Sequence, residues 1–588
     1  MIVPMKKATI LFEKEDAEAT ARYIRHLGVL HIEHQDLPEG SDLTTLQENV
    51  ALIDTSLEVI LRVIGEERDL PPQERIVGDW SAHAHRIVDL GKRQEELETE
   101  SQDILNQISE WGPWGDIDLD QVQDLSRHGI YLGLYEIPAK ETGSFPDDVI
   151  VKTAYVTRDA VHCIAISRRK FECPYREIAP PRERVSVLKK RYEEIDQSIQ
   201  QVRGEIESLA RSYRFLAETR RQLEKEIEFR RVLHGMGKGG PIQYLTGFIP
   251  FDIEERLVSE AKKKRWGIVI SDPSPEDEVP TLMRNPRWVT MIQPVLEFLG
   301  LTPGYRELDV SIPFLIFLCI FFGILIGDAG YGLLYILLTF LLQKKMGSNP
   351  EIRPVISLFY VLSSCAVVWG VLSCTFFGQE WLLSLGFRPL VPQLNDAGFM
   401  QTFCFFIGAL HMSIAHAWRG YVKLPSLTAL VDAGYICILW TAFLLARTLI
   451  LDEPFPTFGL YLVIAGVILV IVFTNPHAPV LRAIGEGLGT IAMSFVNNIT
   501  DVISYIRLYA VGLAGLAIAE TTNTLGHGFG DGILALAVGG AILIIGHCLN
   551  ILLGPLSVLV HGIRLNVLEF SGHANVSWSG VAFKPFKE

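Results

Sequence analysis

One arginine interrupts a long apolar segment in the stretch Ser504-Tyr505-Ile506-Arg507-Leu508-Tyr509-Ala510-Val511-Gly512-Leu513-Ala514. A second arginine, Arg564, lies in the next apolar segment. Both segments are long enough to cross a bilayer, and an arginine within lipid costs at least about 2–3 kcal/mol. Two arginines on consecutive membrane helices therefore indicate a function, and we expect them to face a carboxylate that moves past them.

The chain divides into a charged first half and an apolar second half. From Glu307 onward lie only 12 of the 53 Lys and Arg residues and 15 of the 68 Asp and Glu residues. We therefore predict two domains, residues 1–306 and 307–588, of which the second lies in the membrane. The start of the chain lacks the apolar core of a signal peptide, so the first domain is expected in the cytoplasm. Its acidic balance argues against a nucleic-acid partner.

Sites for cofactors, metals or catalysis are not expected. The eight cysteines form no C-x-x-C pair, which argues against a zinc site and a redox motif. The glycine cluster at residues 237–240 lacks the spacing and the following Lys-Ser/Thr of a phosphate loop. We therefore predict no nucleotide site and no enzyme activity of the chain by itself.

Residue patterns in the first half predict two small α/β lobes joined by long helical arms. Alternation predicts strands at 5–12, 29–34, 130–136, 150–156, 160–166, 242–248 and 266–270. Helical spacing predicts helices at 14–27, 41–64, 85–108 and 251–264. Residues 186–233 carry apolar side chains at spacings of three and four, which is typical of a coiled-coil arm. An ordinary helical domain with surface charge is the alternative, and the length of the pattern disfavours it.

The second half predicts a bundle of eight transmembrane helices, so the chain is mainly α. The predicted spans are 311–326, 333–342, 355–377, 399–418, 427–449, 455–474, 488–524 and 532–568. The last two exceed the roughly 20 residues that a perpendicular helix needs, so they must tilt or extend beyond the bilayer. Basic residues in the connections, with Arg388 and Arg447 as exceptions, place both termini in the cytoplasm.

Small and polar residues follow the helical spacing around each arginine. Such rows can hold water and pass ions, or they can bond neighbouring helices in a packed bundle. No carboxylate lies three or four residues from either arginine. The candidate ion path comprises Ser504 and Ser557 on these rows, Glu520, His547, Asn550 and His561 toward the outside or middle, and Glu486, Asp501 and Glu569 toward the cytoplasm.

The chemistry of arginine suggests how these two residues act. Its pKa is so high that it stays charged even in lipid. A moving Asp or Glu that meets it is held ionised, because an opposite charge lowers the pKa of a carboxylate. Beyond the arginine, the carboxylate must take up an ion before it enters lipid. The arginines would thereby force ion release and block leakage.

Five groups of residues resemble one family in their order and spacing. They are Met5-Lys6-Lys7 with Gly28-Val29-Leu30-His31, Val279-Pro280-Thr281-Leu282 with Asn285, Phe321-Phe322-Gly323 with Gly327-Asp328-Ala329-Gly330-Tyr331-Gly332, Asp501 with Ser504-Tyr505-Ile506-Arg507-Leu508, and Phe583-Lys584-Pro585-Phe586. Over nearly the whole chain the sequence resembles the membrane stator subunit of V-type and A-type rotary ATPases, called subunit I or subunit a.

The resemblance implies a function in a larger complex. Arg507 and Arg564 match the family's two arginines, beside two aqueous half-channels and a rotating ring of proteolipid subunits. The first domain would dock peripheral stalks and contact the adaptor between ring and central stalk. The complex would couple H⁺ or Na⁺ transport to ATP synthesis or hydrolysis on a separate soluble head, in a prokaryotic plasma membrane.

Two positions depart from eukaryotic members of that family. Those members carry a glutamate about ten residues before the second arginine, where this chain has Gly554, and a histidine about eight residues after the first, where it has Gly515. Their exit-channel residues therefore cannot be transferred. A secondary transporter with a cytoplasmic regulatory domain is the alternative function, but it would usually show an internal repeat, and none is clear here. A purely structural adaptor would not need the arginines.

Overall fold

The computed structural model describes residues 1–587 apart from 67–69, 73–78, 139–144, 158–159, 348, 351, 380–385, 475–479 and 529–532. Most of the described residues are helical. They form two compact units. One contains residues 1–12, 24–33 and 245–587, and the other contains residues 13–23 and 34–244. The predicted boundary between residues 306 and 307 divides the first of these units, so the two-domain division stays a prediction.

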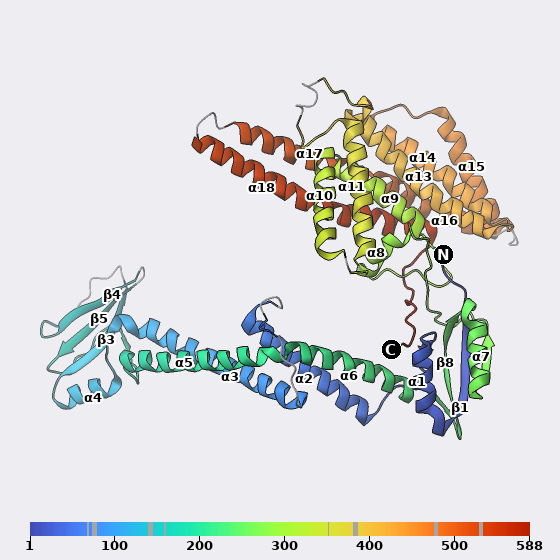
Figure 1. Cartoon of the computed structure of the whole chain (residues 1–588). Helices are drawn as coiled ribbons and strands as arrows, with labels where there is room; N and C mark the ends of the chain where they lie inside the picture. Colours follow the sequence, from blue (N-terminus) through green and yellow to red (C-terminus); the bar gives the residue numbers. More distant parts are fainter. Residues whose placement is uncertain are drawn as a thin grey trace. The chain divides into compact units, whose positions relative to one another are not determined.

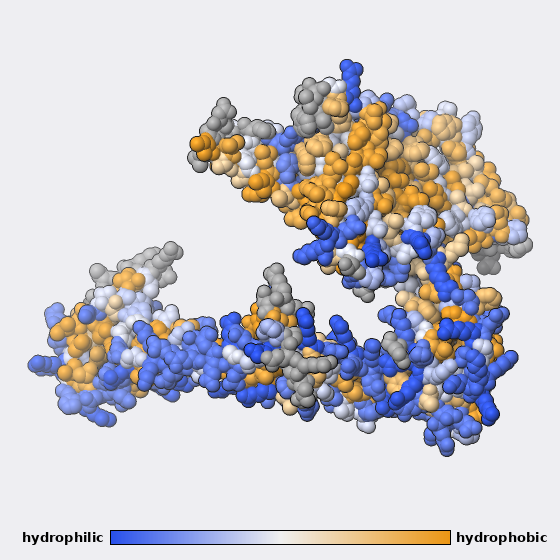
Figure 2. Space-filling model, viewed as in Figure 1, coloured by the Kyte–Doolittle hydropathy of each residue, from blue (hydrophilic) through white to orange (hydrophobic). Residues whose placement is uncertain are grey.

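Two pairs of helices make up most of the smaller unit. Helix α3 (Trp80–Trp111) runs alongside α5 (Val185–Leu209), and α2 (Ser41–Ile64) runs alongside α6 (Tyr213–His234) (Figure 1). Buried leucines and isoleucines join each pair, and hydrophilic residues cover the outer face that Figure 2 shows. The observed pairing explains the helical spacing of the apolar residues, because one stripe of each helix faces its neighbour.

The prediction of one uninterrupted helix over residues 186–233 is wrong, because the segment is divided into two helices. A 3-10 turn at Ala210–Ser212 separates α5 from α6, and the side chain of Ser212 donates to the carbonyl of Leu209 at 2.6 Å. Ala210 and Ser212 are both buried. Neither Pro nor Gly occurs at the break, so the sequence carries no local stop signal. The break instead allows the two halves to pack on different partners.

A four-stranded antiparallel sheet completes this unit. Its strands are β3 (Tyr131–Pro138), β4 (Ile150–Val156), β5 (Ala160–Ser167) and β6 (Arg176–Ile178), in the order β4-β5-β3-β6. The three longer strands agree with the predicted ones. Helix α4 (Leu119–Arg127) begins at Asp118, whose carboxylate accepts from the backbone N–H of Gln121 at 2.7 Å.

The larger unit contains a second sheet with the order β2-β8-β1-β9. Its strands are β1 (Met5–Glu13), β2 (His31–Glu33), β8 (Ile242–Pro250) and β9 (Gly267–Ser271), and the short β7 (Gly237–Gly239) pairs with β8. Helix α1 (Ala17–Leu27) follows β1, and α7 (Glu254–Lys264) connects β8 to β9. Two β-α-β units with this strand order form a split β-α-β sheet. The segment 577–587 then binds back to this unit, where Phe586 is buried and its N–H donates to Leu30 at 2.8 Å.

An ion pair on this sheet predicts acid sensitivity. Lys7 donates to Asp277 at 2.7 Å, and this hydrogen bond lowers the pKa of Asp277. A lowered pKa stabilises the fold above the unfolded value of about 3.9, and the contribution is lost as the pH falls through the folded pKa. We expect Asp277→Asn to remove the part of the stability that is lost as the pH falls. Hydrogen exchange of β1, corrected for intrinsic rates and compared between pH 6 and pH 3, measures it. Asp272→Asn, at an 83% exposed side chain, is the control, and an equal effect of both would contradict the expectation.

Long apolar helices dominate the rest of the larger unit (Figure 2). They are α9 (Ser311–Ile326), α10 (Ala329–Met346), α11 (Arg353–Ser373), α13 (Ala397–Lys423), α14 (Ala429–Leu451), α15 (Thr457–Phe473), α16 (Val480–Ser504), α17 (Ile506–His527) and α18 (Ile533–Ser557). Among the described residues, five helical runs are long and apolar enough to cross a membrane: 353–373, 397–423, 429–451, 493–526 and 536–574. The last two contain 34 and 39 residues, as their predicted lengths require. The count of eight spans stays a prediction.

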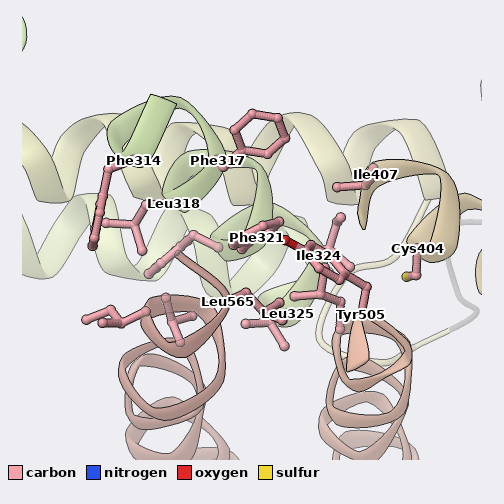
Figure 3. Close-up of a cluster of buried hydrophobic side chains, with 14 of the residues drawn as sticks. Phe314, Phe317, Leu318, Phe321, Ile324, Leu325, Cys404, Ile407, Tyr505 and Leu565 are labelled. Atoms are coloured by element: carbon pink, nitrogen blue, oxygen red, sulfur yellow. The ribbon is translucent and has the colours of Figure 1, made fainter. Parts of the chain in front are cut away.

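Aromatic and aliphatic side chains of α9 lie at the centre of this bundle. Phe314 and Phe321 are fully buried there, and Tyr505 packs into the same cluster (Figure 3). The break between α9 and α10 is capped by Asp328, which accepts from the N–H groups of Gly330 and Tyr331 at 2.7 and 3.1 Å.

Gly370 allows α11 to approach this break closely. A Cβ at that position would lie 2.0 Å from the backbone nitrogen of Ala329. We expect Gly370→Ala to cost about 1–3 kcal/mol, as overpacking of a core does, and to lower the Tm of the detergent-solubilised protein by several degrees. Gly540→Ala on α18 is the matched control, because nothing lies within 4 Å of its added Cβ. Equal Tm values for the two variants would contradict this account.

Candidate functional site

Tyr505 sets the position of Arg507. It separates α16 from α17, and its side chain is fully buried, with its hydroxyl 2.8 Å from Nδ1 of His411. The N–H of Leu508 bonds to the Tyr505 carbonyl at 3.0 Å, which is a tightened turn of the 3-10 type. Gly408 makes room for the Tyr505 ring, since a Cβ there would lie 2.7 Å from it. The anchored tyrosine thereby holds the first turn of α17, which carries Arg507.

A π-helical segment positions Arg564. After α18, the chain forms π-turns at Val558–Gly562 and Leu565–Phe570 before the short helix α19 (Ser571–Ala574). A π-helix bonds residue i to residue i+5, so side chains five apart lie on one face. Glu569 is five residues after Arg564, and its Oε1 lies 3.8 Å from Nε of Arg564. The spacing of three or four used for the sequence could not find this pair.

One buried carboxylate therefore faces both arginines. The Glu569 side chain is 5% exposed, and its Oε1 also lies 4.0 Å from Nη1 of Arg507. Within the described part of the chain, neither Glu569 Oε2 nor Arg507 Nη1 has a hydrogen-bond partner. The Arg564 side chain is 51% exposed. The two guanidinium groups are thus near a counter-charge but retain donors that could bind another carboxylate.

A cavity of about 310 Å³ lies beside this cluster. Glu569 and Asp501 line it, together with His416, Arg419, Tyr435, Ser494, Asn497, Asn498, Leu568, Gly572 and His573. Carboxylates, amides and imidazoles make its wall polar, so it can hold water. It connects the cluster to the last turns of α16.

A second buried carboxylate, Asp432, lies behind this cavity. Its side chain is 1% exposed, and it pairs with Arg419 and with Lys423, whose Nζ is 2.7 Å away. Nδ1 of His416 lies 3.2 Å from Asp432, and Nε2 of His416 lies 2.9 Å from Nδ1 of His573. Nε2 of His573 is 3.1 Å from Oδ2 of Asp501. Asp432, Arg419, His416 and His573 are not among the candidate residues predicted from the sequence.

A larger cavity of about 440 Å³ lies along α17. Its wall includes Asp328, Gln379, Leu508, Gly512 and Glu520. Asp501 and Glu520 are separated by roughly 28 Å at about 1.5 Å per residue, close to the thickness of a bilayer's hydrocarbon core. Along the helical run that carries Arg507, the smaller cavity is lined by residues before this arginine and the larger cavity by residues after it.

His547 lies near the larger cavity with its ring nitrogens already bonded. Nδ1 is 2.7 Å from the hydroxyl of Tyr331, and Nε2 is 3.0 Å from Oδ1 of Asn523. The amide of Asn523 donates to the carbonyl of Phe377 at 2.8 Å, so its oxygen must accept. Nε2 of His547 therefore carries the proton, and Nδ1 accepts from Tyr331. This network ties α10, α17 and α18 together.

The other candidate residues take varied positions. Ser504 donates to the carbonyl of Thr500 at 2.9 Å within its own helix, and Asn550 donates to the carbonyl of Gly515 at 3.0 Å. Ser557 and His561 are half-buried at the start of the π-helical segment. Glu520 is exposed. Glu486 belongs to α16, but its side chain lies outside the described residues.

One of the two glycine departures, Gly554, has a structural reason. A Cβ at Gly554 would lie 2.6 Å from Cδ1 of Ile326 and 2.9 Å from the hydroxyl of Tyr335. That hydroxyl donates to the carbonyl of Ile551 at 2.9 Å. A side chain at Gly554 would therefore collide with α9 and α10. At Gly515, a Cβ would lie 3.6 Å from Oδ1 of Asn550, which is an ordinary contact.

Comparison with known proteins gives relatives along the whole chain. No protein-family model matches the sequence. It is 29% identical to V-type ATP synthase subunit I 1 of Treponema pallidum and 28% identical to V-type ATP synthase subunit I of Borreliella burgdorferi, and each match covers 100% of both chains. It is 24% identical to A-type ATP synthase subunit I of Methanocaldococcus jannaschii, over 60% of this chain and 56% of that protein.

A solved structure of the cytoplasmic N-terminal domain of subunit I, homolog of subunit a, of V-ATPase also matches. It covers 45% of this chain at 13% identity with a TM-score of 0.22, which is too low to compare the folds. The sequence matches confirm the expected resemblance. This protein is similar to subunit I of V-type and A-type ATP synthases, and its similarity to the two V-type proteins spans its full length.

Proposed function

We propose that this chain is the ion-translocating stator subunit of a rotary ATPase and has no catalytic site of its own. The observation that carries the proposal is the buried Glu569 facing both Arg507 and Arg564 at 4.0 and 3.8 Å. Glu569 lowers the cost of placing two arginines in the membrane, because a buried charge needs a partner. Its contacts are long enough to leave both arginines able to attract a second carboxylate.

That second carboxylate would belong to the rotating proteolipid ring. Arg564 is half exposed, so its guanidinium is accessible to a partner. A ring carboxylate that reaches the arginines is held ionised and releases its ion, because the positive charges favour its anionic form. Moving away into lipid, it must bind another ion. Arg507 and Arg564 would thus separate the ion's entry from its exit.

The two cavities would provide entry and exit. The cavity at Asp501 and Glu569 would serve the cytoplasmic side, and the cavity along α17 that Glu520 lines would serve the other side. Of the candidate residues, Asp501, Glu569 and Glu520 line these cavities. His547 and Asn550 would hold the helices around the outer cavity, as their hydrogen bonds suggest. Ser504, Ser557, His561 and Glu486 remain candidate members of the path.

The soluble parts would connect this stator to the rest of the complex. The sheet of β3 to β6 and the paired helices would dock peripheral stalks, and the remainder of residues 1–306 would contact the adaptor between ring and central stalk. Residues 307–588 would form the eight-span membrane domain, with both termini in the cytoplasm of a prokaryote. The named relatives are ATP synthase subunits, which supports partners of this kind.

A secondary transporter is less well supported. Such proteins place binding sites on broken helices, and the α9–α10 break with its buried Asp328 has that form. The Asp328 carboxylate, however, is occupied by the N–H groups of Gly330 and Tyr331 and by that of Gly378 at 2.9 Å. A carboxylate used as a cap in this way has a structural role.

Isolation of the native complex tests the proposal. We expect an affinity tag on this chain to co-isolate a proteolipid ring and an ATPase head, and vesicles containing the complex to accumulate ions when ATP is added. A chain that purifies alone and transports a solute in vesicles would establish the transporter alternative instead.

A further inference from the structure

A continuous chain of hydrogen bonds crosses the wall of the smaller cavity. Nη2 of Arg419 lies 3.1 Å from Nδ1 of His416. Nε2 of His416 lies 2.9 Å from Nδ1 of His573, and Nε2 of His573 lies 3.1 Å from Oδ2 of Asp501. The four residues belong to α13, α19 and α16, so the chain exists only in the folded bundle.

The first arrangement of protons follows from the obligatory donors. Arginine can only donate, so Nδ1 of His416 accepts from Arg419 and Nε2 carries the proton. That proton is donated to Nδ1 of His573, whose Nε2 must then carry its own proton. Nε2 of His573 donates to the ionised Asp501, which can only accept. Every contact from Arg419 to Asp501 is then satisfied with two neutral histidines, but Nδ1 of His416 presents a lone pair to Oδ1 of Asp432 at 3.2 Å, so that contact is lost.

A second arrangement exchanges the contact with Arg419 for one with Asp432. Nδ1 of His416 also lies 3.2 Å from Oδ1 of Asp432, a carboxylate that can only accept. If Nδ1 carries a proton and donates to Asp432, Nε2 of His416 accepts from Nδ1 of His573. Nε2 of His573 then accepts from a protonated Asp501. Arg419, which can only donate, loses its contact with Nδ1 of His416 in this arrangement, so each polarity of the chain satisfies one of the two neighbours of Nδ1.

We propose that His416 and His573 conduct protons between the surroundings of Asp432 and Asp501, so that H⁺ is the ion carried through the smaller cavity. This inference rests on the proposed stator function. A hydronium ion from the solvent at the partly exposed Arg419 and Lys423 gives a proton to Nδ1 of His416 and leaves water. The Nε2–H bond of His416 breaks at the same time, and the released proton bonds to Nδ1 of His573. The Nε2–H bond of His573 breaks in turn, and that proton bonds to Oδ2 of Asp501.

The step moves one proton, and both histidines are neutral before and after it. Asp501 releases its proton into the cavity that it lines with His416 and His573, and exchange with cavity water returns the rings to their first tautomers. Side-chain relays of Asp, Glu and His are the usual proton paths within membranes.

The side chains of this row of hydrogen bonds favour a proton over a metal cation as the transported ion. Hard cations prefer oxygen ligands, whereas two consecutive members of this chain are imidazoles. Arg419 and Lys423 at its far end repel a cation that must travel as an ion. A proton that passes by exchange of bonds leaves both imidazoles neutral, so it does not dwell beside these cations as a free ion.

The test uses the whole complex reconstituted in vesicles. Glutamine can donate and accept but does not relay a proton as imidazole does, so we expect His416→Gln and His573→Gln to slow ATP-driven acidification by about tenfold or more. External imidazole is expected to restore a His573→Ala variant, because the cavity adjoins the vacated position. His162→Gln, which replaces a buried histidine of β5, is the control and should keep the rate of the unsubstituted complex.

The outcomes separate this inference from the stator proposal. Three outcomes would contradict proton transfer through His416 and His573 without contradicting the stator function. They are full proton transport by His573→Gln, accumulation of radioactive Na⁺ in place of H⁺, and a loss of transport that imidazole does not restore. An unsubstituted complex that transports no ion would remove the stator proposal itself. If the histidine variants do not assemble, Asp501→Asn applies the same test, because it keeps the contact with His573 but cannot take up the proton.

Discussion

Replacing Arg507 with alanine is expected to abolish ATP-driven ion transport by the assembled complex, with a loss of about 100-fold or more. The substitution removes the charge that would hold a ring carboxylate ionised, and no other guanidinium except Arg564 lies near Glu569 among the described residues. Ions could then pass between the two cavities without turning the ring. Acidification of vesicles by the purified complex measures the effect.

The strongest control for this expectation is another arginine of the membrane helices. Arg447 on α14 pairs with Glu453 and stacks on Phe443 at 5.8 Å, so it already has local partners. Arg447→Ala should retain most of the transport. Arg507→Lys should remain strongly impaired, because an ammonium group lacks the planar fork that engages a carboxylate through two donors. Normal pumping by Arg507→Ala would refute the proposed role of the arginine.

The largest loss of stability is expected for Asp432→Ala. The side chain is 1% exposed and pairs with Arg419 and Lys423, which are 21% and 36% exposed. Removal of one partner from a buried ion pair costs about 3–5 kcal/mol. Partial exposure of the two cations reduces this to about 2–4 kcal/mol, because water compensates part of their charge. Thermal unfolding of the detergent-solubilised protein should show a Tm lower by several degrees.

An exposed pair provides the comparison for that experiment. Glu18 and Arg22 lie one helical turn apart on α1 with side chains 50% and 69% exposed, so Glu18→Ala should leave the Tm nearly unchanged. A second variant, Asp432→Asn, keeps the size of the side chain and should lower the Tm almost as much, since the missing charge causes the loss. Unchanged Tm values for both Asp432 variants would show that the cations are satisfied by solvent.

Local patterns were sufficient for most of the elements. Alternation located β3, β4 and β5, and the apolar run around Arg507 gave the length of the arginine-bearing helices, because both depend on which side chains avoid water. The turn at Ala210–Ser212 left no such signal, since buried packing rather than Gly or Pro stops the helix there. The two arginines were also recognisable from the sequence, because a charge within an apolar run is costly.

The arrangement around those arginines depends on contacts between distant residues. The π-turns bring Glu569 beside Arg564 and Arg507, whereas α-helical spacing would place them on different faces. His416, Asp432 and His573 are separated by up to 157 positions and meet only through the packing of α13, α14 and α19. The sequence by itself therefore determined that this protein has a membrane bundle with two arginines. Tertiary structure alone decided which carboxylates and histidines surround them, because hydrogen bonds and ion pairs act over a few ångströms in space whatever the separation along the chain.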